Sequence, residues 1–120
     1  MKQIDILGKM FEVRDCIHLL HLNTTSYAEH KALGKFYDEW IELADDFIET
    51  YQGRYQRIEG KVSINIASDY NSTEYLNECL DFIQKDAMSI VSPMYDIDLI
   101  NILADMQGLI NRTIYLLTLK

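Results

Sequence analysis

The sequence predicts an all-α protein, an antiparallel four-helix bundle that forms one domain over residues 1–120. Apolar residues recur at spacings of three and four in four separate stretches, which is the pattern of amphipathic helices. The chain has only one proline and five glycines, so little interrupts these stretches. The first connection is very short and the second is long, as expected for a bundle with one crossover.

The first two helices are expected at residues 4–22 and from Ser26 to Gly53. A polar run at residues 23–26 ends the first helix. Ser26, followed three residues later by Glu29, forms a capping-box pattern that starts the second helix. The expected core stripe of the first helix is Ile6, Met10, Val13, Ile17 and Leu20. That of the second helix is Leu33, Phe36, Trp40, Ala44, Phe47 and Tyr51.

The connection over residues 53–70 is expected to be irregular or strand-like. Val62, Ile64 and Ile66 alternate there with Ser63 and Asn65, which is the pattern of a short strand. Because a lone strand is not stable, this segment is expected to lie on the bundle or to pair with another chain.

The last two helices are expected from Asn71 to Ser92, and from Asp96 or Ile97 to Leu119. Ser92-Pro93 ends the third helix because the residue before proline disfavours the helical conformation. The fourth helix is apolar on more than one face, so it is buried on several sides or contributes to an oligomer interface. The expected core stripe of the third helix is Leu76, Leu80, Ile83, Ala87 and Ile90.

The composition excludes some partners and locations. Nineteen Asp and Glu against eleven Lys and Arg give a net charge of −8, which repels nucleic-acid phosphates and anionic membranes. No apolar run approaches the roughly 20 residues of a membrane span, and charges interrupt the first apolar stretch before it could act as a signal peptide. Cys16 and Cys79 lie inside helical patterns and are interpreted as reduced core thiols. A cytoplasmic protein without general nucleic-acid or membrane binding is therefore expected.

The candidate functional residues are His30, Asp45 and Glu49, which fall close to one stripe of the second helix. His30 and Asp45 are about 22 Å apart along that helix at 1.5 Å rise per residue. A metal ion holds its ligands at about 2.0–2.2 Å, so one copy of the helix cannot close a site with both ends. Two antiparallel copies can, because the His30 end of each meets the Asp45 and Glu49 end of the other. A homodimer or higher homo-oligomer is therefore the expected partner state.

Two further histidines, His18 and His21, lie at the end of the first helix, next to His30 across the short turn. Imidazole nitrogen combined with carboxylate oxygen suits Fe, Zn or Mn. The alternative is that these histidines are hydrogen-bonded structural residues and that the acids belong to an ordinary solvated face.

Two sequence runs resemble a known family. The stretch His21-Leu-Asn-Thr-Thr-Ser-Tyr-Ala-Glu-His30, followed by Asp45-Asp-Phe-Ile-Glu49, is similar to the Dps-type miniferritins, and the run from Asp98 onward is similar to their last helix. The chain also resembles short ferritin-like proteins encoded by tailed phages. The resemblance implies a ferritin-like fold and an iron-oxidising site at a two-fold interface. One copy would supply His21 and His30 (with His18 as an alternative to His21), and the other would supply Asp45 and Glu49.

The chain departs from that family in ways that limit the implication. Gly34 stands where the family has an aspartate, and Asp38, one turn further, is only a partial substitute. The loop between the histidines is three residues shorter, and a basic tail is missing. Two functions follow as alternatives: a protein that binds iron (or Zn or Mn) and oxidises Fe(II), or a non-catalytic binding or assembly module with an incomplete site. Tyr37 and Trp40 are candidate redox-active aromatics or core residues.

Overall fold

The computed structural model describes all 120 residues and is all-helical, with no strand. The expected helices are therefore confirmed, with boundaries that differ by a few residues. The fourth helix ends earlier than expected, because its last residues form a turn rather than helix. The elements are α1 (Gln3–Asn23), α2 (Tyr27–Arg54), α3 (Ser72–Asp81), η1 (Phe82–Asp86), η2 (Ala87–Ile90) and α4 (Ile97–Leu116).

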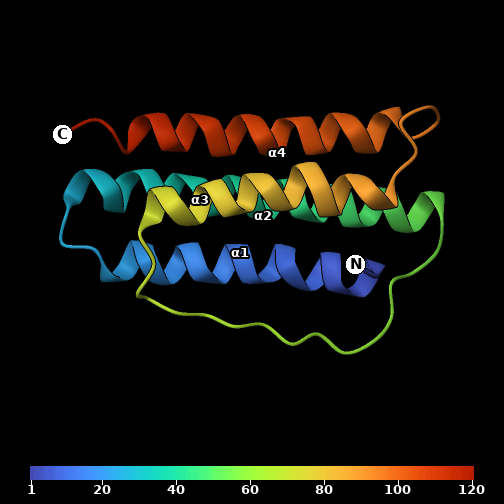
Figure 1. Ribbon diagram of the computed structural model, residues 1–120, viewed down its shortest axis with the longest axis horizontal. Helices are drawn as coiled ribbons and strands as arrows, with labels where there is room; N and C mark the ends of the chain where they lie inside the picture. The colour runs from blue at the N-terminus through green and yellow to red at the C-terminus, as the bar shows by residue number, and fades with distance from the viewer.

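The helices lie along the long axis of a body that measures 43 × 28 × 20 Å (Figure 1). α1 and α2 form a hairpin and run in opposite directions. Residues 55–71 then return along the molecule, so α3 runs in the same direction as α2. α4 runs back beside them, and the C-terminus lies near the α1–α2 turn.

The predicted core stripes of α1 and α2 are buried without exception. Trp40 is fully buried, and its indole nitrogen donates to the main-chain oxygen of Met10 at 2.9 Å, which ties α2 to α1. The same core includes residues of α3 and α4, so one apolar interior joins all the helices. No helix combines the length and the apolar character that crossing a membrane requires.

The third helix differs from the single regular helix that the sequence predicts. It begins as expected, since the Asn71 side chain accepts from the N–H of Glu74 at 3.0 Å. After Asp81 it continues as one π-helical segment and then as one 3₁₀ segment. A π turn adds a residue to the helical turn and so changes which side chains face the core. Ile83 and Ala87 of the predicted stripe are buried, whereas Leu80 and Ile90 are only half-buried and Phe82, which lies outside the predicted stripe, is buried.

The connection between α2 and α3 is irregular, and α1 holds it in place. The N–H of Asn65 donates to the Glu12 carboxylate at 2.8 Å, and the Cys16 thiol contacts the oxygen of Ala67 at 3.6 Å. Gly8 leaves room for Val62, because a Cβ there would lie 2.9 Å from Val62 Cγ1. Of the two expected alternatives, the segment lies on the bundle, as extended chain without strand pairing.

A buried carboxylate joins the far ends of α2 and α4. Asp96 accepts from the N–H of Ser92 at 2.8 Å, from Arg54 Nε at 3.2 Å and from the Tyr55 hydroxyl. These donors lower the pKa of Asp96, the Ser92 N–H first and the Tyr55 hydroxyl second. These hydrogen bonds to Asp96 hold together the end of the bundle that lies opposite the histidines.

Candidate functional site

The three histidines gather at the turn between α1 and α2. Ser26 caps α2 by accepting from the N–H of Glu29 at 3.2 Å. The expected capping box is only half formed, because the Glu29 carboxylate instead accepts from the Ser72 hydroxyl at 2.6 Å. Glu29 thus links the start of α2 to the start of α3, and the tight turn brings His21 against His30.

His21 and His30 form a stacked and reciprocally hydrogen-bonded pair. Their ring centroids are 3.8 Å apart and their planes differ by 16°. His21 Nδ1 lies 2.6 Å from the main-chain oxygen of His30, and His30 Nδ1 lies 2.8 Å from the main-chain oxygen of His21. A carbonyl oxygen only accepts, so Nδ1 carries the proton in both rings. In the neutral form, each Nε2 therefore keeps a free lone pair.

Gly34 makes this arrangement possible. A Cβ at Gly34 would lie 3.0 Å from Nδ1 and 2.8 Å from Cε1 of His21, and the second distance is shorter than real Cβ contacts. Gly34 is therefore the residue that admits the His21 ring against α2. A glycine permits a close approach at this position, but the sequence does not reveal that the approaching group is an imidazole of the same chain.

The remaining aromatic candidates lie around this pair. His18 stacks on Tyr37 with centroids 4.4 Å apart, and Tyr37 meets His21 edge-on at 5.5 Å. Trp40 is a core residue, since it is fully buried and hydrogen-bonded to α1. The exposed Asp38 lines the same shallow groove of about 670 Å³ as His21 and His30, together with Leu116 and Leu119 from the C-terminal end.

The two carboxylates lie at the other end of α2. Asp45 and Glu49 are both exposed, and α2 is a continuous helix from Tyr27 to Arg54. The separation of about 22 Å between His30 and Asp45 that helix rise gives therefore holds, and Glu49 lies one turn further away. Within one chain, no three His, Cys, Asp or Glu side chains converge as a metal site. The nearly parallel rings of His21 and His30 also do not direct both lone pairs at one point. Each imidazole in this conformation offers one separate nitrogen.

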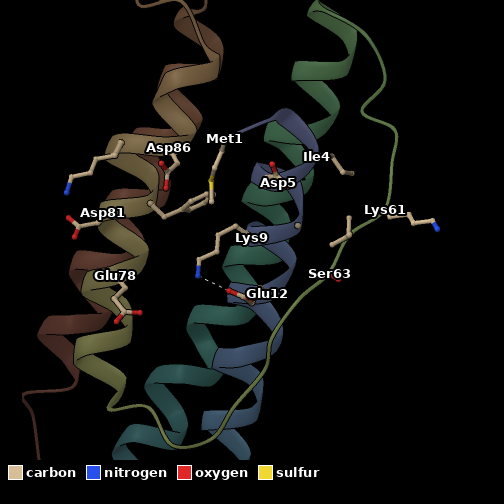
Figure 2. A pocket seen from close by; sticks show the side chains of 14 residues that line it. Met1, Ile4, Asp5, Lys9, Glu12, Lys61, Ser63, Glu78, Asp81 and Asp86 are labelled. Atoms are coloured by element: carbon tan, nitrogen blue, oxygen red, sulfur yellow. Dashed lines mark hydrogen bonds and ion pairs between the residues drawn. The ribbon is translucent and has the colours of Figure 1, made fainter.

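A second, charged groove of about 620 Å³ lies between α1, the third helix (α3 and η1) and the connection (Figure 2). Lys9 Nζ pairs with Glu12 at 2.7 Å inside it. Burial alone would raise the pKa of Glu12, but the hydrogen bonds from Lys9 and from the Asn65 N–H lower it. The hydroxyl of Tyr75 nearby is buried without a hydrogen-bond partner, and burial raises its pKa, so it stays protonated. Sequence reasoning missed this groove, since it depends on where the connection lies.

Comparison with known proteins identifies one family. The family DUF5856, described as a family of unknown function, matches residues 21–117, which include His21, His30, Asp45 and Glu49 but not His18. No curated protein matches the chain, and no solved structure matches it either. Because the match spans well over half of the sequence, the chain belongs to DUF5856.

Proposed function

We propose that this chain is a ferritin-like, antiparallel four-helix bundle, related to the Dps-type miniferritins, that binds iron at an interface between two copies. The direction of the helices supports the fold. α2 and α3 run the same way, joined by a long crossover, and α1 and α4 run the opposite way (Figure 1). Bundles of ferritin-like type contain one such crossover. Zinc and manganese are alternative cargoes for the same donors.

The observation that carries the metal proposal is the pair of hydrogen bonds from Nδ1 of His21 and His30 to main-chain oxygens. Metal-bound histidines almost always donate their other ring N–H to a carboxylate, a carbonyl or water, which fixes the tautomer and the ring. Both rings already have this arrangement, with Nε2 as the free nitrogen.

The carboxylates of the site would come from a second copy. If two α2 helices pack antiparallel, the His30 end of each lies beside the exposed Asp45 and Glu49 of the other. His21 and His30 would each supply one nitrogen, and Glu49 would bridge two ions. Oxidation at such a site balances with a peroxide: two Fe(II) each lose one electron, the O–O bond breaks, and two protons are taken up to give two waters.

The test separates a ligand from a structural histidine by the variant His30→Asn. Asparagine keeps a side-chain N–H near the place of Nδ1 but has no counterpart of Nε2. The expected result is a melting temperature close to that of the wild type together with loss of Fe(II) binding under anaerobic conditions. Asp46→Ala is the matched control for an acid on α2 outside the proposed ligand set, and it should bind normally.

Mixing variants tests the shared site. His30→Asn and Asp45→Ala/Glu49→Ala should each bind no iron alone. A hybrid dimer has one intact site out of two, so an equal mixture should recover about a quarter of the wild-type capacity if pairing is random. Wild-type protein that takes up no Fe(II), Zn(II) or Mn(II), or a mixture that recovers nothing, overturns the proposal.

A second candidate function is a non-catalytic assembly module, and the packing of His21 favours it. The ring fills the space that Gly34 leaves, its Nδ1 binds the main chain of His30, and its own main-chain oxygen accepts from the His30 ring. On this alternative the histidine pair only fastens α1 to α2. It predicts that His30→Ala lowers the melting temperature, whereas metal addition changes the melting temperature of no variant.

A further inference from the structure

The connection between α2 and α3 has an open main-chain edge. Residues 56–70 form no hydrogen bond between main-chain groups. Their main-chain contacts to side chains are those of Ile58, Asn65 and Ala67. Figure 1 shows this segment along the outer margin of the molecule, on the side of α1 away from α4. An exposed extended segment with unpaired N–H and C=O groups is a template for pairing with another strand.

The two anchors show which groups face outward. The N–H of Asn65 and the C=O of Ala67 both point to α1, where Glu12 and Cys16 bind them. Main-chain groups of successive residues in an extended chain point to opposite sides. The groups of the even-numbered residues 62, 64 and 66 therefore point away from the helices.

The side chains of the same residues are only partly covered. Val62, Ile64 and Ile66 are 39%, 38% and 41% exposed, although Val62 packs on Gly8. Figure 2 shows Lys61 directed away from the helices, whereas Ala67 is half-buried. The apolar face formed by Val62, Ile64 and Ile66 is only half covered by α1. A second strand, paired along the open main-chain edge, would cover the remainder of this face.

We propose that this segment pairs antiparallel with the same segment of a second copy, with Asn65 on the two-fold axis. This register places Ile64 opposite Ile66 and Lys61 opposite Asp69 of the partner copy, on both sides of the axis. Cross-strand apolar and opposite-charge pairs stabilise such an interface. Moving the axis to residue 64 would instead place Glu59 opposite Asp69, which is repulsive.

The local charge favours a copy of this chain as the occupant. The protein carries a net charge of −8, so two copies repel each other over most of their surfaces. Residues 60–68 contain one charged side chain, Lys61, and it is positive. This is a place where two acidic molecules can approach closely. The proposal is independent of the metal site, because no residue of that site lies in the segment.

Engineered cysteines in the full-length chain test the register. Asn65→Cys places two thiols opposite each other across the axis, in a pair without main-chain hydrogen bonds, where Cα atoms are about 4.5 Å apart. That separation allows a disulfide. Ser63→Cys is the matched control, because the two copies of residue 63 would be about 14 Å apart along the strands at 3.4 Å per residue. Mild oxidation should give a disulfide-linked dimer of Asn65→Cys and none of Ser63→Cys.

Charge exchange tests the partner contact. Lys61→Asp should weaken the dimer about 3- to 30-fold, since two symmetric pairs change sign. Asp69→Lys should do the same, and the double variant Lys61→Asp/Asp69→Lys should restore association. Sedimentation or light scattering over a range of concentrations measures each. Equal cross-linking of both cysteine variants, a dimer indifferent to Lys61→Asp, or a wild-type protein that stays monomeric overturns the proposal.

Discussion

Replacing Gly34 by alanine tests the histidine pair most directly. The new Cβ would lie 2.8 Å from Cε1 of His21, and the ring has little freedom to move away. It is held by a 2.6 Å hydrogen bond to the oxygen of His30 and by the stack at 3.8 Å. Any shift that relieves the clash therefore weakens the stack, the hydrogen bond or both.

The expected cost follows from three contributions. Overpacking a filled site costs about 1–3 kcal/mol. Loss of a hydrogen bond adds about 1 kcal/mol, and the higher helix propensity of alanine offsets about 1 kcal/mol. Gly34→Ala should therefore destabilise the protein by about 1–3 kcal/mol. At about 4 °C per kcal/mol, the melting temperature should fall by about 4–12 °C.

The same helix supplies the control. A Cβ at Gly53 would meet no atom within 4 Å, so Gly53→Ala should stabilise by up to about 1 kcal/mol through propensity alone. In a His21→Ala background the clash disappears, and Gly34→Ala should become stabilising as well. Circular dichroism with urea and with heat measures all four variants. If Gly34→Ala stabilises the otherwise wild-type chain as Gly53→Ala does, the described packing of His21 is wrong.

Three further outcomes are expected. Cys16 and Cys79 are buried, and burial raises the pKa of Cys79 to about 12. Neither thiol should therefore react with an aromatic disulfide reagent until the chain unfolds, and rapid labelling of the native protein would contradict this. The lowered pKa of Asp96, due first to the Ser92 N–H, gives stability that is present at neutral pH and lost as the pH falls below about 5. Urea titrations of Asp96→Asn should therefore show a shallower loss of stability in acid than the wild type. Equal slopes of unfolding free energy against pH would contradict the stabilising role of these hydrogen bonds. Gly60 has a φ of +142°, so Gly60→Ala should cost about 1–3 kcal/mol by urea denaturation, whereas an unchanged midpoint would mean that another backbone conformation is accessible.

Periodicity in the sequence predicted the helices because burial on one face is a local pattern. Every predicted core residue of α1 and α2 is buried, and the caps at Ser26 and Asn71 form as expected. Gly53 was correctly placed near the end of α2. These features depend on neighbours within one or two helical turns, which a single sequence displays.

Features that depend on distant contacts could not be predicted in the same way. Glu29 fits a capping box by its spacing, but Ser72, which is far away in the sequence, takes its carboxylate. The π segment of the third helix leaves no distinct local pattern. The alternation of Val62, Ile64 and Ile66 indicated an extended segment, but not that Glu12 and Cys16 would hold it on α1.

The candidate site also combines features that the local sequence predicts with features that depend on distant contacts. Short loop length predicted that His21 and His30 would be neighbours, and they are. Their stacking and their tautomers depend on side-chain rotamers and on Gly34, which spacing does not specify. The meeting of histidines with Asp45 and Glu49 depends on a second copy and stays a prediction.

The two proposed contacts between copies would lie on opposite sides of α1. Gly8, Glu12 and Cys16 face the connection, and at 100° per residue His21 lies roughly 140–180° further round the helix. One pairing therefore leaves the other surface free. Two different two-fold contacts on one chain generate a closed tetramer or an open filament rather than a dimer. If both exist, Lys61→Asp should reduce the wild-type assembly to a dimer that still binds iron. A wild-type dimer that becomes monomeric on Lys61→Asp would leave only the contact along the connection, and the shared metal site would then have no second copy to complete it.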